Sequence, residues 1–550
     1  MKLTEQDINI RYIVDGVEKR AIGPENEDFS LDLVQKDERT TITLHAKKPI
    51  KLVTSSFEVP YTYEEGDQLY INGYQSWTET REYELSEYLR DIKKSVPAII
   101  RNRYHLENYG DAWFMDYQKD NFHSFTFAYR RHRDGETHFI GSLNEENAFL
   151  IIHYKKEENV LSIRSDCEYK EVEDDFCLYD FVEYTGEMMD TAGQYFAHYG
   201  VCEAPPISGY TSWYLHYQNI NEEKMRKALD GVDSDCFDLF QIDDGYETFV
   251  GDWMDIDKKK FPNGLKPLVD EIHGKGLKAG IWLAPFVCEK KSRLYKEHPD
   301  WLYHESGKPV FAGCNWSGDV TLDLRLTEVQ DYIRKCLNFY MDMGFDFFKL
   351  DFLYAAALIH EGRGMTRAEI MRRSMKGLRE ILGDKMILGC GVPLSSAFNL
   401  VDYCRIGPDV SNSYDDSFIM RKLHRERVST KVTMQNTIFR SIMDGTVFRC
   451  DPDVYVLRDS DTNLSGEERR ALTIINHLCG SVYMTSDNNA SYQYETHSVM
   501  KEAHAVQNAK ITDILKIGTD IKIEFEIDGK THVITFPVDL GQIDEDIKTY

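Results

Sequence analysis

The sequence lacks the long apolar runs that enter or cross a membrane. It has no stretch of about 18 consecutive apolar residues. Its first residues, MKLTEQDINIRYIVDG, contain no apolar segment of the kind found in secretory signals. We therefore expect no membrane partner and a cytoplasmic location.

Basic residues and paired cysteines are also scarce. The chain of 550 residues has 65 Lys and Arg against 93 Asp and Glu, a net charge of −28. Because duplex-binding proteins neutralise phosphates with clustered Lys and Arg, this balance predicts no nucleic-acid partner. The 11 cysteines contain no CxxC pair, which disfavours a disulfide framework or a zinc site and predicts reduced thiols.

The sequence does contain enough apolar side chains for a large core, with a hydrophobic fraction of 42% and an aromatic fraction of 12%. Its first 206 residues carry runs that alternate apolar and polar side chains. Examples are TTITLHA (40–46), SFTFAYR (124–130), FLIIHY (149–154) and VLSIRS (160–165). Such short alternating strands predict an antiparallel β-sandwich. The Pro205-Pro206 step then marks the first domain boundary, giving a domain over 1–206.

Residues 207–508 alternate short apolar strands with helical patterns. The candidate strands are 209–215, 237–243, 278–284, 345–351, 386–390 and 402–406. In the helical stretch 327–344, the apolar side chains fall on one face. This alternation fits either a (β/α)8 barrel or a doubly wound sheet. Because no GxGxxG or GxxxxGK[ST] opens a helix, we favour the barrel.

The last 42 residues, 509–550, form a third predicted unit. A helical pattern at about 495–516 is followed by IKIEFEI (521–527) and THVITFP (531–537), which flank an Asp528-Gly529 turn. The predicted fold is thus a central (β/α)8 barrel with an N-terminal antiparallel β-sandwich and a small C-terminal antiparallel β module.

Ionisable residues stand at the ends of several predicted barrel strands. They are Asp243, Asp244, Lys349, Asp351, Arg405, Asp409 and Asp487. In a barrel, functional side chains come from the carboxyl ends of the strands and the loops that follow. A single aspartate at such a place commonly caps the strand by accepting backbone N–H groups. Several of them at converging strand ends favour a site.

The spacing of Lys349 and Asp351 puts both side chains on one side of an extended strand. A nearby cation keeps a carboxylate ionised, which suits Asp351 for a nucleophile; a purely structural ion pair is the alternative. Asp409 follows Gly407-Pro408 into a loop. If it faces Asp351 from a less polar wall, loss of solvation raises its pKa and suits it for a general acid.

The tryptophans give a second indication of the kind of ligand. Five of the seven in the chain lie in the predicted barrel: Trp213, Trp253, Trp282, Trp301 and Trp316. Aromatic faces stack on the C–H face of a sugar, although each tryptophan taken singly is equally typical of a core. Acid pairs beside aromatic side chains indicate a neutral, polyhydroxylated ligand.

The chain resembles the compact bacterial α-galactosidases of glycoside hydrolase family 36, which are melibiase-like. The resemblance lies in INGYQSW (71–77), GYTSWY (209–214), QIDDGYETFVGDW (241–253), GIWLAPF (280–286), EHPDWL (297–302), FFKLDFL (347–353), LGCGVPL (388–394), RIGPDV (405–410) and DPDVYVLR (451–458). These segments occur in the family's order. One departure is that relatives often carry a tryptophan soon after the acid/base, where this chain has Tyr414 as its nearest aromatic.

The resemblance implies roles for particular residues. Asp351 matches the nucleophile and Asp409 the acid/base. Asp243 and Asp244 match the pair that binds the O4 and O6 side of galactose, and Lys349 resembles the lysine that binds the 3- and 4-hydroxyls. Cys390 and Arg405 resemble residues near the 2-hydroxyl and the reacting centre. Trp213 and Trp282 resemble pocket walls, and Trp77, from the sandwich domain, resembles a tryptophan that reaches over to the pocket rim.

Together these observations predict a retaining exo-α-galactosidase that acts on an α-galactoside by double displacement. The chemistry requires no metal and no cofactor. Three alternatives stay open: an α-N-acetylgalactosaminidase, a Mg²⁺-dependent barrel enzyme, and a galactoside-binding protein without catalysis. The sequence does not determine the oligomeric state.

Overall fold

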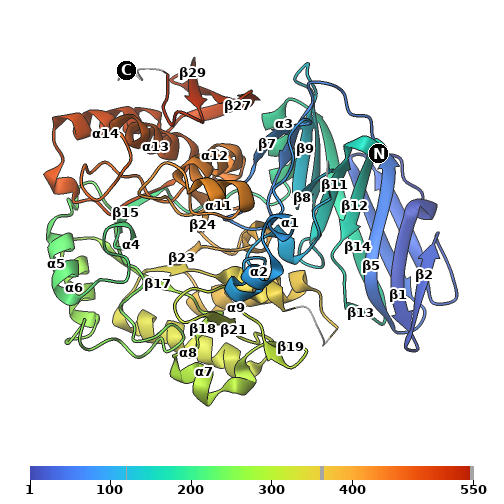
Figure 1. Cartoon of the computed structure of the whole chain (residues 1–550), viewed down its shortest axis with the longest axis horizontal. Helices are drawn as coiled ribbons and strands as arrows, with labels where there is room; N and C mark the ends of the chain where they lie inside the picture. The colour runs from blue at the N-terminus through green and yellow to red at the C-terminus, as the bar shows by residue number, and fades with distance from the viewer. Residues whose placement is uncertain (119–120, 360–363, 545–550) are drawn as a thin grey trace.

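The computed structural model describes residues 1–118, 121–359 and 364–544. Its first part is a pair of antiparallel sheets, drawn on the right of Figure 1. In hydrogen-bonded order, one sheet contains β2 (Val17–Ile22), β1 (Ile8–Val14), β5 (Ile50–Pro60), β12 (Val160–Ser165), β11 (Leu150–Lys155) and β8 (Asn121–Phe125), with β13 (Glu171–Val172) on β5. The other contains β3 (Phe29–Lys36), β4 (Arg39–Ala46), β14 (Asp175–Gly186), β10 (Thr137–Ser142), β9 (Phe127–Arg131), β6 (Gln68–Ile71) and β7 (Arg81–Glu84). The predicted β-sandwich is therefore confirmed.

One predicted strand of the sandwich was wrong. The run 124–130 is two strands, β8 and β9, which belong to different sheets. Between them Thr126 has a φ of +68°, a left-handed conformation that breaks an extended strand. Apolar alternation continues across the break because both strands face the same core.

The middle of the chain is a parallel barrel, as expected. Among the described residues its sheet has eight strands: β15 (Ile207–Thr211), β16 (Leu239–Ile242), β17 (Lys278–Leu283), β22 (Phe347–Leu350), β23 (Met386–Gly389), β24 (Tyr403–Arg405), β25 (Arg449–Asp451) and β26 (Val482–Thr485). Between β25 and β26 the N–H of Ser481 donates to the carbonyl of Cys450 at 3.0 Å. This bond brings the two ends of the sheet together.

Helices surround this sheet (Figure 1). They are α4 (Trp213–His216), α5 (Glu222–Asp230), α6 (Lys266–Gly274), α7 (Arg293–Glu297), α8 (Thr327–Met343), α9 (Arg367–Leu382), α10 (Leu394–Ala397), α11 (Phe418–Leu423), α12 (Thr430–Arg440), α13 (Gly466–Cys479) and α14 (Tyr494–Val506). Helix α8 buries Val329, Ile333 and Leu337, which confirms its apolar face. The strand predicted over 209–215 ends at Thr211, because Ser212 turns into helical backbone and Trp213 begins α4.

Further short elements complete the chain. The sandwich part also contains α1 (Ile92–Ser95), α2 (Ala98–Tyr104) and α3 (Met188–Phe196). Loops of the barrel carry the pairs β18 (Val287–Glu289) with β21 (Asp319–Thr321), and β19 (His304–Glu305) with β20 (Lys308–Pro309). No helix within the described ranges is long and apolar enough to cross a membrane.

The C-terminal unit is a three-stranded antiparallel sheet of β27 (Lys510–Ile517), β28 (Asp520–Ile527) and β29 (Lys530–Pro537). The hairpin at Asp528-Gly529 is confirmed, with φ values of +50° and +73° that suit a tight turn. The helical pattern predicted to about 516 was wrong beyond Val506, since β27 follows α14 directly. We keep the division of the chain into 1–206, 207–508 and 509–550 as a proposal.

Candidate active site

A cavity of about 450 Å³ opens where the barrel strands end. Eight of the ten predicted site residues line it: Trp77, Trp213, Asp243, Asp244, Trp282, Lys349, Asp351 and Asp409. The sequence reasoning missed further lining residues, which are Tyr109, Gln218, Cys314, Asn315, Trp316, Phe352, Tyr354, Pro408, Glu426, Arg427 and Val428. Most of these come from loops, where no periodic pattern marks a residue.

Asp351 follows β22 directly and is 8% exposed. Its Oδ2 accepts a hydrogen bond of 3.1 Å from the indole Nε1 of Trp282 on the neighbouring strand β17. Its Oδ1 accepts the backbone N–H of Phe352 at 2.8 Å. The two donors fix the orientation of the carboxylate in the cavity.

Lys349 forms its ion pair with a different partner from the one expected. Its Nζ lies 2.9 Å from Oδ2 of Asp243 at the end of β16, which only β17 separates from β22, whereas Asp351 makes no ion pair with it. Burial is the largest single influence and would lower the pKa of Lys349, but the negative charges around it, with Asp243 first and Asp351 adding to it, together outweigh burial and the pKa is raised. The lysine therefore stays charged inside the cavity.

Asp244 lies beside Asp243 and is held by two side chains that also line the cavity. Its Oδ2 accepts 2.9 Å hydrogen bonds from Nε2 of Gln218 and from Nε1 of Trp316. Its backbone N–H donates to Oδ1 of Asp243 at 2.9 Å. The acidic pair is thus one connected group at one end of the cavity.

Asp409 enters the cavity from the loop after β24, with 37% of its side chain exposed. Its Oδ1 accepts a 3.1 Å hydrogen bond from Nη1 of Arg405. Loss of solvation raises the pKa of Asp409, and the negative charge of Asp351 adds to the rise; Arg405 and Lys349 oppose it. This environment favours the protonated form of Asp409 more than water would.

Arg405 is buried behind Asp409 and joins it to two aspartates that the sequence reasoning did not single out. Its Nε donates to Asp451 at 2.9 Å, and its Nη2 lies 2.7 Å from Oδ1 of Asp453. Burial raises the pKa of Asp453 to about 7. The hydroxyl of Tyr214 also donates to Asp453. The DPDVYVLR segment was the signal that contained both aspartates.

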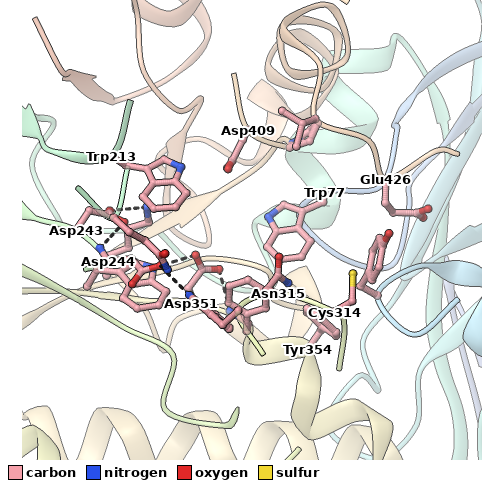
Figure 2. A pocket seen from close by; sticks show the side chains of 18 of the residues that line it. Trp77, Trp213, Asp243, Asp244, Cys314, Asn315, Asp351, Tyr354, Asp409 and Glu426 are labelled. Atoms are coloured by element: carbon pink, nitrogen blue, oxygen red, sulfur yellow. Dashed lines mark hydrogen bonds and ion pairs between the residues drawn. The ribbon is translucent and has the colours of Figure 1, made fainter. Parts of the chain in front are cut away.

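Figure 2 shows Asp351 and Asp409 on opposite sides of the cavity, with Trp213 and Trp77 on its flanks. Trp77 comes from the sandwich, in the loop between β6 and β7. Its ring meets Phe352 edge to face at 5.4 Å. A wall of the cavity is therefore supplied by the N-terminal part of the chain.

A buried arginine of α12 holds this loop against the barrel. Arg440 donates hydrogen bonds to the carbonyls of Ser76 at 2.6 Å and of Ile406 at 2.7 Å. It also donates to the carbonyls of Gly73 and Gln75. One side chain thus ties the Trp77 loop to the end of β24.

Two predicted site residues do not line the cavity. Cys390 is 1% exposed and lies behind Lys349 and Asp351, whose charges act on its thiol; burial raises the pKa of this thiol well above its usual value. Arg405 reaches the cavity only through Asp409. Tyr414 does not line it either, because its hydroxyl donates to the carbonyl of Val538 in the C-terminal unit.

Within residues 1–118, 121–359 and 364–544, no three His, Cys, Asp or Glu side chains are grouped so that they hold a metal ion. The charged residues of the cavity instead bind one another. Asp351 accepts a hydrogen bond from Trp282, Asp243 from Lys349 and Asp409 from Arg405.

Residues 204–387 match the model of the melibiase family. Over 129 residues, 22% of this chain, the sequence is 36% identical to an α-galactosidase of Lactobacillus acidophilus, and the match spans 17% of that relative's length. The α-galactosidase of Thermus thermophilus in complex with stachyose aligns with a TM-score of 0.68 at 25% identity and covers 89% of this chain and 97% of that chain.

The chain resembles the melibiase-like α-galactosidases. The family-model match begins just before β15 and ends in β23, so it contains Asp243, Asp244, Lys349 and Asp351. A family 36 α-galactosidase of Geobacillus stearothermophilus aligns at 13% identity with a TM-score of 0.61, covering 92% of this chain and 72% of that chain. At that identity the likeness concerns the fold alone.

Proposed function

We propose that this chain is a retaining exo-α-galactosidase, a glycoside hydrolase that removes terminal α-linked galactose by double displacement. The observation that carries the proposal is that Asp351 and Asp409 line one cavity from opposite sides, with tryptophan walls and an acidic pair at one end. The likeness to melibiase-family α-galactosidases supports it.

In the first step, the Asp351 carboxylate attacks the anomeric carbon of the galactosyl unit. Protonated Asp409 gives its proton to the departing glycosidic oxygen, so the leaving group departs as an alcohol. The Trp282 and Phe352 N–H groups support the attacking carboxylate in this geometry. The product of the step is a β-linked galactosyl ester of Asp351.

In the second step, ionised Asp409 takes a proton from a water molecule, and the water oxygen attacks the anomeric carbon. The ester bond to Asp351 breaks and the carboxylate is regenerated. Two inversions restore the α configuration. Arg405 favours the ionised form that Asp409 needs at this stage, because its guanidinium lies next to Oδ1.

The remaining cavity residues suit a galactose ring. Asp243, Asp244 and Lys349 present charged acceptors and donors for its hydroxyls, and the axial 4-hydroxyl is the group they would select. Trp213 and Trp282 offer apolar faces to its C–H groups. The Thermus relative was solved with stachyose, and we propose small α-galactosides of that kind for this chain.

The deciding experiment compares turnover of an aryl α-galactoside with that of its 2-acetamido counterpart. Preference for the galactoside, with α-galactose as the first product in proton NMR, is the expected result. Preference for the acetamido sugar would indicate an α-N-acetylgalactosaminidase. First release of β-galactose would contradict the retaining mechanism.

Two further outcomes would distinguish the proposed glycosidase from a sugar-binding protein and from a metal-dependent enzyme. Saturable galactose binding without hydrolysis would indicate a binding protein that lacks catalysis. Loss of activity in a chelator, with recovery on adding Mg²⁺, would indicate a metal-dependent reaction; the proposal expects the chelator to have no effect. A cytoplasmic location also stays a prediction, which fractionation of the native cells tests.

A further inference from the structure

Glu247 is a buried acidic residue that the mechanism above does not use. It lies in the turn after β16, three residues beyond Asp244, and is 6% exposed. The backbone N–H of Gly245 donates to its Oε2 at 3.3 Å. No Lys or Arg in the described part of the chain forms an ion pair with it. A buried carboxylate with so little support is costly.

Its neighbour Asp244 has an oxygen in need of a donor. Oδ2 of Asp244 accepts from Gln218 and Trp316, whereas Oδ1 is buried and receives no N–H or hydroxyl from the described residues. Because Oδ1 is closed off from the cavity, a ligand hydroxyl cannot supply that hydrogen bond. Buried polar atoms are nearly always paired, so a donor next to Oδ1 is expected.

The carboxyl of Glu247 is the neighbouring group that can supply the donor. It lies within hydrogen-bonding reach of Asp244, and burial, followed by the charge of Asp244, raises the pKa of Glu247 well above its usual value. Two ionised carboxylates in contact would repel strongly away from water. Since Oδ2 of Asp244 already accepts two N–H donors, the negative charge is better placed on Asp244 and the proton on Glu247.

We propose that Glu247 is a positioning residue, which is protonated at neutral pH and donates a hydrogen bond to Oδ1 of Asp244. The bond completes the set of donors around Asp244 and fixes its carboxylate at the acidic end of the cavity. The proposal rests on the proposed function only where it assigns Asp244 to galactose binding. The shared proton itself is a property of the fold.

The surroundings of Glu247 contain few other charged groups. A negative charge on Glu247 would raise the pKa of the phenols of Tyr246 and Tyr340. The ammonium group of Lys260 donates to the carbonyl of Gly245 in the same turn at 2.6 Å. When Glu247 loses its proton at alkaline pH, the donor to Asp244 is lost, and galactose affinity should fall.

The test measures galactose affinity by calorimetry and KM for an aryl α-galactoside between pH 5 and 9 in two variants. Glu247→Gln keeps a donor that never ionises, and Glu247→Met keeps the volume without a donor. We expect about tenfold weaker binding in E247M, the usual size for a lost hydrogen bond to a charged group. E247Q should stay close to wild type and lose the alkaline weakening. Equal effects of E247Q and E247M, or an unchanged alkaline limb in E247Q, would overturn the proposal.

Two readouts do not depend on activity. The infrared spectrum of wild type minus that of E247Q at pH 7 should show the C=O band of a protonated carboxyl. The folded pKa of Glu247 lies above its ordinary value of 4.5, so its contribution to stability is present below that value and is lost as the pH rises toward the folded pKa. The melting temperature of E247Q relative to wild type should therefore increase over that range.

Glu145 supplies a matched control. It is a buried glutamate with a raised pKa that accepts hydrogen bonds from Ser395 and Thr126, away from the cavity. E145Q should remove a carboxyl band of its own and alter the pH dependence of stability without changing galactose affinity. If wild type hydrolyses no galactoside, the proposed function fails, and the infrared and melting results still decide the state of Glu247. Absence of the carboxyl band would overturn the inference even in a fully active enzyme.

Discussion

The indole N–H of Trp282 donates a hydrogen bond of 3.1 Å to Oδ2 of Asp351. The two residues come from the adjacent barrel strands β17 and β22. Trp282 is itself held in place, with its ring meeting Trp253 edge to face at 5.8 Å. The orientation of the proposed nucleophile therefore depends on the packing of a neighbouring strand.

Trp282→Phe should lower kcat/KM for an aryl α-galactoside by roughly tenfold or more, since a hydrogen bond to a charged group is lost while the aromatic wall remains. Trp253→Phe is the matched control, because it removes the same indole group from the same cluster without touching Asp351. Steady-state kinetics of both variants checks this. Similar losses in the two would mean that packing, rather than the hydrogen bond, is responsible.

Asp351→Ala should abolish nearly all turnover, because the ester intermediate cannot form. Azide, which is small enough to attack from the vacated side, should restore part of the activity and yield β-galactosyl azide. Product analysis by NMR checks the configuration. A lack of rescue, or rescue to the α-azide, would argue against Asp351 as the nucleophile.

Asp409→Ala should affect substrates unequally. Loss should be small for a dinitrophenyl galactoside, whose leaving group needs no proton, and at least about a hundredfold for an oligosaccharide, in line with general acid catalysis. Measuring kcat/KM for both substrates tests this. A uniform loss would assign Asp409 another role.

The pH profile follows from the same residue. Protonated Asp409 is the form required in the first step, and its pKa is raised. For an oligosaccharide, kcat/KM should thus persist above the ordinary range of an aspartic acid, about pH 4, and fall as the pH rises through the raised pKa. In D409N, the residual kcat/KM for the same oligosaccharide should show no such alkaline fall. If the alkaline fall persists in D409N, the titration of another group causes it.

Arg440→Met should lower the free energy of unfolding by about 3 kcal/mol or more, since several buried carbonyls lose their donor. The same change should weaken galactoside binding, because the carbonyls of Ser76 and Gln75 next to Trp77 are released. Arg334→Met on the exposed face of α8 is the control and should stay within about 0.5 kcal/mol of wild type. Urea denaturation measures both. An unaffected KM in R440M would mean that Trp77 keeps its place without this support.

Local patterns were sufficient for much of the architecture. Alternation with period two marked the sandwich strands, and strand–helix alternation marked the barrel, because burial on one side of an element repeats at that element's own period. The periodicity of apolar residues was insufficient where short segments determine the course of the chain. The three-residue strand β25 has no period to detect, and Thr126 splits one apolar run between two sheets.

The sequence by itself determined which acidic residues stand at the ends of the barrel strands, since order along the chain and the strand pattern place them there. Only the tertiary structure decided which of these side chains form ion pairs and hydrogen bonds with one another. The order of the strands in the barrel pairs Lys349 with Asp243 instead of Asp351, and Arg440 brings Trp77 from the sandwich to the cavity. Such pairings join residues far apart in sequence, and their distances depend on strand register and packing, which no local pattern contains.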